Sequence, residues 1–111
     1  MRTLKFIVHD QIIEKDPNCD FDNLVPGTEG YIQASFSFSS EWTGCVKVAG
    51  FYSQMGTEYE PQIINDRGTC MIPAEALKRR IFKIQVIGLD TINSRRLTTN
   101  RLEVCQNGGR T

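Results

Sequence analysis

The chain has 111 residues, of which 40% are hydrophobic, and its 13 basic residues balance its 13 acidic residues. This length fits one domain with a single buried core, and the neutral balance argues against a nucleic-acid-binding protein, which usually shows a basic excess. Two short basic clusters, at 77–80 and 94–97, come nearest to a nucleic-acid site, and we interpret them as solvated loop ends.

The beginning of the chain does not have the pattern of a signal peptide. Lys5, His9 and Asp10 interrupt its apolar positions, so no continuous apolar segment forms. No stretch approaches the roughly 20 apolar residues of a membrane span. We therefore expect a soluble protein that is made in the cytosol and contacts no membrane.

The first third of the chain predicts strands separated by one long loop. Residues 3–10 alternate, with Leu4, Phe6 and Val8 on one face, and residues 11–16 continue this strand or pair back on it. Residues 17–30 are rich in Pro, Asp, Asn and Gly and predict a long turn region. Residues 31–40 again alternate cleanly, as a strand with one buried and one solvated face does.

The segment 41–53 contains the only tryptophan and is expected to form a hairpin with residues 31–40. Its phase is ambiguous, because Val46 and Val48 lie on one face while Ala49 and Phe51 lie on the other. A bulge at Gly50 would bring Phe51 back toward the core.

Two short strands and one helix follow. Residues 59–65 predict an edge strand because of Pro61, residues 65–68 a turn, and residues 69–72 a second short strand. Residues 73–80 predict a helix of about two turns, with Pro73 at its first position, Glu75 in its first turn and basic residues in its last.

The last third predicts the centre of a sheet and its closing strand. Residues 81–89 are apolar on both faces, which is typical of a central strand, and residues 95–106 place Leu102 and Val104 inward. Leu97 is out of phase with these two, which predicts a bulge near Thr99–Asn100. Residues 107–111 are predicted to be a flexible end.

Together these segments predict an all-β fold: an antiparallel, immunoglobulin-like sandwich of about seven to eight strands, with one short helix, in a single domain over 1–106. We expect no disulfide bond between its two sheets. Six side chains should fill the space between the sheets: Phe36, Phe38, Trp42, Phe51, Phe82 and Val104. Pro73, at the start of the short helix, completes this set of core residues. Trp42, Tyr52 and Tyr59 are the alternative candidates for a partner-facing surface.

Residues that could carry chemistry are few and scattered. The only histidine, His9, is interpreted as a surface residue, and Cys70 is the one cysteine near a helix start that could lower its pKa. The four cysteines lack the close pairs of a zinc site and are expected to be reduced. The acidic segment 16–23 lacks the spacing of a calcium loop, and the carboxylates lie in loops or edges. We expect no enzyme, no metal and no cofactor.

Several segments resemble a group of small structural proteins of phages that infect Gram-positive bacteria. The resemblance covers nearly the whole chain and includes an alternating phenylalanine strand, a W-x-G turn, a C-x-I-P corner before a short helix and a T-T-N near the end. The matching residues are Phe36, Phe38, Trp42, Gly44, Lys47, Ala49, Phe51, Cys70, Ile72, Pro73, Thr98, Thr99 and Asn100. It implies an immunoglobulin-like or baseplate-like sandwich located in a virion and synthesised in the host cytoplasm.

The expected function is a non-enzymatic virion component: a capsid decoration protein or a tail, baseplate or fibre module. Its partners would be capsid or tail proteins, or further copies of itself, with the loop 17–30 carrying docking contacts. The alternative is a module that binds carbohydrate on the host surface. Exposed aromatic residues beside polar loops would favour it, and the candidates are Tyr31, Trp42, Tyr52 and Tyr59.

Overall fold

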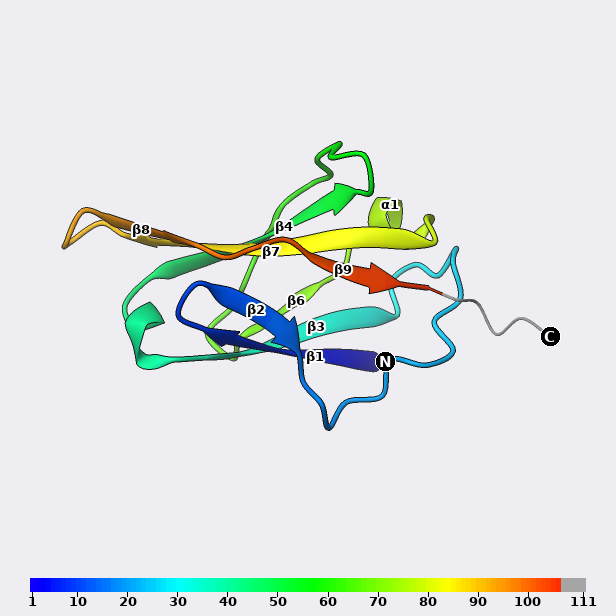
Figure 1. Ribbon diagram of the computed structural model, residues 1–111, viewed down its shortest axis with the longest axis horizontal. Coiled ribbons are helices and arrows are strands. Elements are labelled where there is room, and N and C mark those ends of the chain that lie inside the picture. The colour runs from blue at the N-terminus through cyan, green and yellow to red at the C-terminus, as the bar shows by residue number, and fades with distance from the viewer. Residues whose placement is uncertain (107–111) are drawn as a thin grey trace.

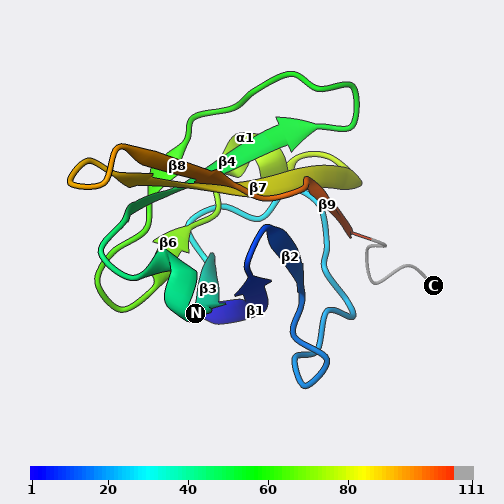
Figure 2. The same cartoon turned by 60° about the vertical axis from the view of Figure 1, so that its left-hand side comes forward.

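The computed structural model describes residues 1–106, and within them nine strands form two sheets packed face to face (Figures 1 and 2). The all-β sandwich is confirmed, with nine strands rather than seven or eight. The predicted flexible end at 107–111 lies outside the described residues. No helix in 1–106 has the length and apolar character that crossing a membrane requires.

The first sheet, sheet A, has the strand order β2-β1-β3-β6. Its strands are β1 (Arg2–His9), β2 (Ile12–Lys15), β3 (Ile32–Phe38) and β6 (Thr69–Met71). β2 turns back and pairs antiparallel with β1, whereas β1 and β3 pair in parallel from Arg2 opposite Ile32 to Val8 opposite Phe38. A parallel pair needs a long connection, and here it runs over residues 10–31 and includes β2.

The second sheet, sheet B, is built around β7 (Ile81–Asp90), which is the predicted central strand. β4 (Val46–Ser53) pairs with β7 along its whole length, and β5 (Gln62–Ile63) forms the edge beyond β4. The other side of β7 pairs first with β8 (Arg95–Thr98) and then with β9 (Leu102–Cys105). β5 directly follows Pro61, as expected for an edge strand.

Two predictions about β4 are wrong. β3 and β4 do not form a hairpin, because the 3-10 helix η1 (Ser40–Trp42) carries the chain from sheet A to sheet B. Gly50 is not a bulge, since the pairing of β4 with β7 continues through it without a slip. Ala49 and Phe51 reach the core from a regular strand, and Val46 and Val48 point to the opposite face.

The predicted helix over 73–80 is a single turn, α1 (Ala74–Leu77). Its end is set by Gln106, whose side-chain amide donates hydrogen bonds to the carbonyl oxygens of Leu77 and Arg79 at 2.9 and 2.7 Å. The backbone N–H of Gln106 donates to the carbonyl of Arg80. Because these carbonyls face Gln106, they do not accept bonds from a further helical turn.

The predicted bulge at Thr99–Asn100 is confirmed. Between β8 and β9, three residues (99–101) face two residues of β7 (85 and 86), so the pairing slips by one position. Thr99 is buried and fills the slip, because its hydroxyl accepts a hydrogen bond from the backbone N–H of Val86 at 3.0 Å. The slip brings Val104 back into the core.

The same bulge connects the two sheets. The Asn100 side chain accepts a hydrogen bond from the N–H of Ile13 at 2.8 Å and donates to the carbonyl of Ile13 at 3.4 Å, and its own N–H donates to the carbonyl of Gln11. Asn100 thus pairs with the free edge of β2 as a strand residue would. It joins sheet B to sheet A on this side of the sandwich.

Replacing Asn100 by alanine is expected to lower the free energy of unfolding by about 1–3 kcal/mol, because both backbone groups of Ile13 lose their partner at a half-buried edge. Urea unfolding followed by tryptophan fluorescence would measure it. Asn18→Ala, at an exposed loop residue, is the control and should change stability by less than about 0.5 kcal/mol. Equal effects of the two substitutions would contradict this role for Asn100.

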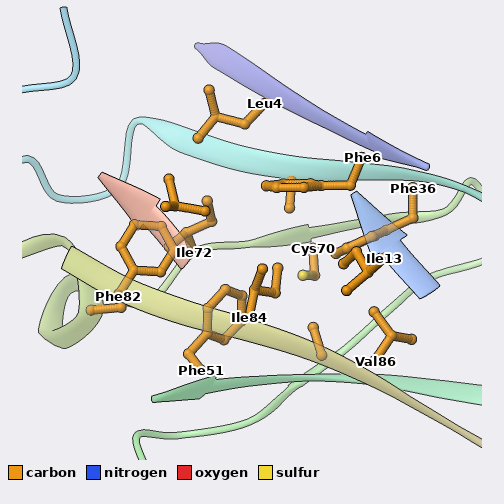
Figure 3. Close-up of a cluster of buried hydrophobic side chains, with 14 of the residues drawn as sticks. Leu4, Phe6, Ile13, Phe36, Phe51, Cys70, Ile72, Phe82, Ile84 and Val86 are labelled. Carbon is orange, nitrogen blue, oxygen red and sulfur yellow. The ribbon is translucent and has the colours of Figure 1, made fainter. Parts of the chain in front are cut away.

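The core lies between the sheets and receives side chains from both (Figure 3). Leu4, Phe6 and Phe36 come from sheet A, and Phe51 and Phe82 come from sheet B. Their alternate spacing along β1, β3, β4 and β7 is the pattern read from the sequence. This packing leaves the opposite faces of both sheets to solvent or to partners.

Candidate functional site

The predicted core residues lie where the alternation placed them. Phe36, Trp42, Phe51, Phe82 and Val104 are buried, Phe38 packs against the core while partly exposed, and Pro73 directly precedes α1. The buried members of this set stabilise the sandwich.

Trp42 is fully buried, so its alternative role as a partner-facing residue is wrong. Its indole N–H donates a hydrogen bond to the carbonyl of Asp10 at 2.8 Å, and its ring centroid lies 5.5 Å from that of Phe38. The ring is close to β7 at Gly88, where a Cβ atom would lie 2.7 Å from the ring carbon Cζ3. The absence of a side chain at Gly88 lets the indole lie between the layers.

The prediction that Tyr52 faces a partner is also wrong, because this residue is only 5% exposed. Its ring folds over Gly50 on the outer side of β4, and its hydroxyl lies 3.2 Å from the side-chain oxygen of Gln85. The Arg101 guanidinium covers the ring, with its central carbon 3.8 Å from the ring centroid. Of the predicted partner-facing residues, Tyr59 alone remains partly exposed.

The predicted docking loop, residues 17–30, is tied to the sandwich. Leu24 is buried in the core, and the Phe21 ring meets Phe6 edge to face with 5.5 Å between centroids. The guanidinium of Arg2 donates to the backbone carbonyls of Asp20, Asp22 and Asn23. The loop therefore covers one end of the core through Phe21 and Leu24, while most of its other residues face solvent.

The candidate base, His9, and the candidate nucleophile, Cys70, lie in different surroundings. The His9 side chain is 74% exposed, as predicted. Burial raises the pKa of the Cys70 thiol to about 12, so this cysteine is protonated at neutral pH. Among the described residues the four cysteines are free, and no group of three or more His, Cys, Asp or Glu side chains is arranged to hold a metal ion.

The outward side of sheet B carries a group of aliphatic side chains that the sequence analysis did not single out as a site. Val48 lies between Ile63 on β5 and Ile87 on β7, and Val46 lies opposite Leu89 in the neighbouring row. Ile63 is 74% exposed, Val46 57% and Leu89 40%, while Val48 and Ile87 are half-buried. We call these five residues the outer apolar face.

The outer apolar face is continuous, because neighbouring strands lie about 4.8 Å apart and successive same-side residues about 7 Å apart. Thr98 and Arg96 on β8 adjoin it, opposite Ile87 and Leu89. Contiguous exposed apolar surface is typical of protein interaction sites, whereas single exposed apolar residues are ordinary. This face is therefore the candidate docking surface.

A second feature is a hollow of about 380 Å³ at the opposite end of β4. We call it the Tyr59 hollow. One wall is the loop after β4, and the other is the corner between α1 and β7, which Figure 1 shows at the same end of sheet B. Its lining consists of Ser53, Gln54, Met55, Thr57, Tyr59, Arg79, Arg80 and Ile81.

Comparisons with protein-family models, with curated proteins and with solved structures find no match to this chain.

Proposed function

We propose that this chain is a non-enzymatic structural protein of a phage particle, either a capsid decoration protein or a tail, baseplate or fibre module. The observation that carries the proposal is the outer apolar face, a patch of five aliphatic side chains on a sheet whose inner side already fills the core. The resemblance of the W-x-G, C-x-I-P and T-T-N segments to small phage structural proteins gives the class of assembly.

The physical demands of such a role agree with this surface. A particle component binds its neighbours through a face that repeats in many copies, so each contact can be weak while the assembly is stable. The patch spans two rows of side chains across three strands. That is smaller than the roughly 800 Å² per partner of a tight complex, and it suits a contact that repetition strengthens.

The test is incorporation of variants into particles. Leu89→Lys and Ile63→Lys should each reduce the number of copies in purified virions by at least about five-fold, because an unpaired ammonium group would be buried at the contact at a cost above about 1 kcal/mol. Both side chains are exposed in the free chain, so folding should be retained. Quantitative mass spectrometry of the particles measures the copy number.

Ile92→Lys is the matched control. Ile92 is also aliphatic and 90% exposed, but it lies in the turn between β7 and β8, outside the outer apolar face. It should leave incorporation unchanged. Absence of the native chain from purified particles would contradict the virion role, and equal loss with all three variants would contradict the docking face. Hundreds of copies per particle would indicate the shell, and a handful the tail.

A module that binds carbohydrate on the host surface is the second candidate function. One specific feature favours it: the partly exposed Tyr59 lines a hollow together with hydroxyl and guanidinium groups. Sugar sites commonly combine an apolar ring with a few polar groups in a concave surface.

A further inference from the structure

We propose that the Tyr59 hollow binds a phosphorylated sugar or polyol, with Arg79 and Arg80 holding the phosphate group. This inference rests on the second candidate function and specifies its ligand class. It is independent of the outer apolar face, which lies on the other half of sheet B.

The hollow has two walls that hydrogen bonds hold in place. In the loop after β4, the Ser53 hydroxyl accepts from the N–H of Thr57 at 2.9 Å, the Ser53 N–H donates to the Thr57 carbonyl at 2.8 Å, and the Tyr59 N–H donates to the Phe51 carbonyl at 2.8 Å. A wall with these three bonds needs little ordering when a ligand binds, which favours affinity.

The second wall is fixed by a buried side chain. Gln106 is 1% exposed, and its bonds to the carbonyls of Leu77, Arg79 and Arg80 hold the corner from which both arginines project. The guanidinium groups of Arg79 and Arg80 are on exposed residues, and within residues 1–106 no carboxylate forms an ion pair with either. Two adjacent arginine residues therefore line one side of the hollow.

The chemistry of the lining selects the ligand class. Guanidinium groups match phosphate oxygens with paired, charge-assisted hydrogen bonds. The Tyr59 ring offers an apolar surface, and Ser53, Gln54 and Thr57 offer polar side chains for hydroxyl groups. The volume of about 380 Å³ is at the small end of ligand sites and suits a single sugar unit.

The experiment titrates the isotope-labelled full chain with glucose 6-phosphate and follows the backbone amides by two-dimensional NMR. We expect shifts confined to Thr57, Tyr59, Arg79, Arg80 and Ile81, with a Kd on the order of 1 mM at low salt. Glucose and inorganic phosphate are separate arms, and each should bind roughly ten-fold or more weakly. Glucose binding as tightly as glucose 6-phosphate would overturn the role of the arginines, and phosphate binding as tightly would overturn the sugar part of the proposal.

Two variants and one matched control locate the site. Arg79→Gln and Arg80→Gln should each raise the Kd for glucose 6-phosphate roughly three- to ten-fold, the effect of losing one charge-assisted contact at an exposed site. Arg67→Gln removes one positive charge from an exposed turn residue that does not line the hollow, and it should leave the Kd unchanged. Equal weakening by all three variants would overturn the site.

These results are separable from the virion proposal. The titration uses the isolated chain, so its failure leaves the incorporation experiment unaffected. Failure of incorporation with intact glucose 6-phosphate binding would instead leave this site in place.

Discussion

Replacing Trp42 by alanine is expected to lower the free energy of unfolding by about 3–5 kcal/mol, the typical loss for a large aromatic side chain in a core. The indole is fully buried, contacts the Phe38 ring and holds the Asp10 carbonyl. Gly88 cannot fill the space, because it has no side chain. Urea unfolding followed by circular dichroism would measure the loss, since the variant has no tryptophan to report by fluorescence.

Trp42→Phe is the second variant, to be compared with Trp42→Ala in the same measurement. It keeps an aromatic ring between the sheets but loses the hydrogen bond to Asp10, so it should retain more stability than Trp42→Ala. A loss below about 1 kcal/mol for the alanine variant would show that the ring is not a structural part of the core.

Replacing Leu24 by alanine is expected to cost about 2–5 kcal/mol, although the residue lies in a long irregular loop. Leu24 is 1% exposed and belongs to the core cluster. Val25 is its neighbour in sequence but is 51% exposed, so Val25→Ala is the control and should change stability by less than about 0.5 kcal/mol. Thermal or urea unfolding compares the two.

This prediction bears on whether the loop 17–30 docks on a partner. Deleting residues 17–28 would remove Leu24 and Phe21 from the sandwich, and poor incorporation of that variant would then report lost folding. Substitutions at exposed positions such as Val25 test docking by the loop without this effect. If Leu24→Ala and Val25→Ala prove equally mild, the loop is not part of the core.

The alternation of apolar residues was sufficient to predict the layers. It identified the inward residues of β1, β3 and β7, and the phase change at Leu97 located the bulge at Thr99–Asn100. It could not identify the neighbours of each strand. The parallel pairing of β1 with β3 depends on the connection over residues 10–31 folding back, and that geometry has no local signature in the sequence.

The site was harder to predict, because side-chain contacts decide which residues are exposed. Tyr52 looks available in the sequence, but Arg101 covers it from a strand that is distant along the chain. Conversely, apolar residues on both faces predict a central strand at β7, and at β4 they predict a change of phase at a Gly50 bulge. In the structure Val46, Ile87 and Leu89 point away from the core, and their presence on the second face was the available signal for a docking surface.

The position of β1 has a consequence for synthesis on the ribosome. This strand emerges before the other eight described strands, yet it is internal in sheet A and its neighbour β3 begins only at Ile32. In sheet B, the first half of β7 is unpaired on one side until β9 has been made, and β9 ends at Cys105. Sheet A is complete only after Met71 and sheet B only after Cys105, so the nascent chain holds unpaired apolar strands for most of its elongation. Such intermediates favour aggregation, and slower translation of residues 39–105 is expected to lower the soluble yield.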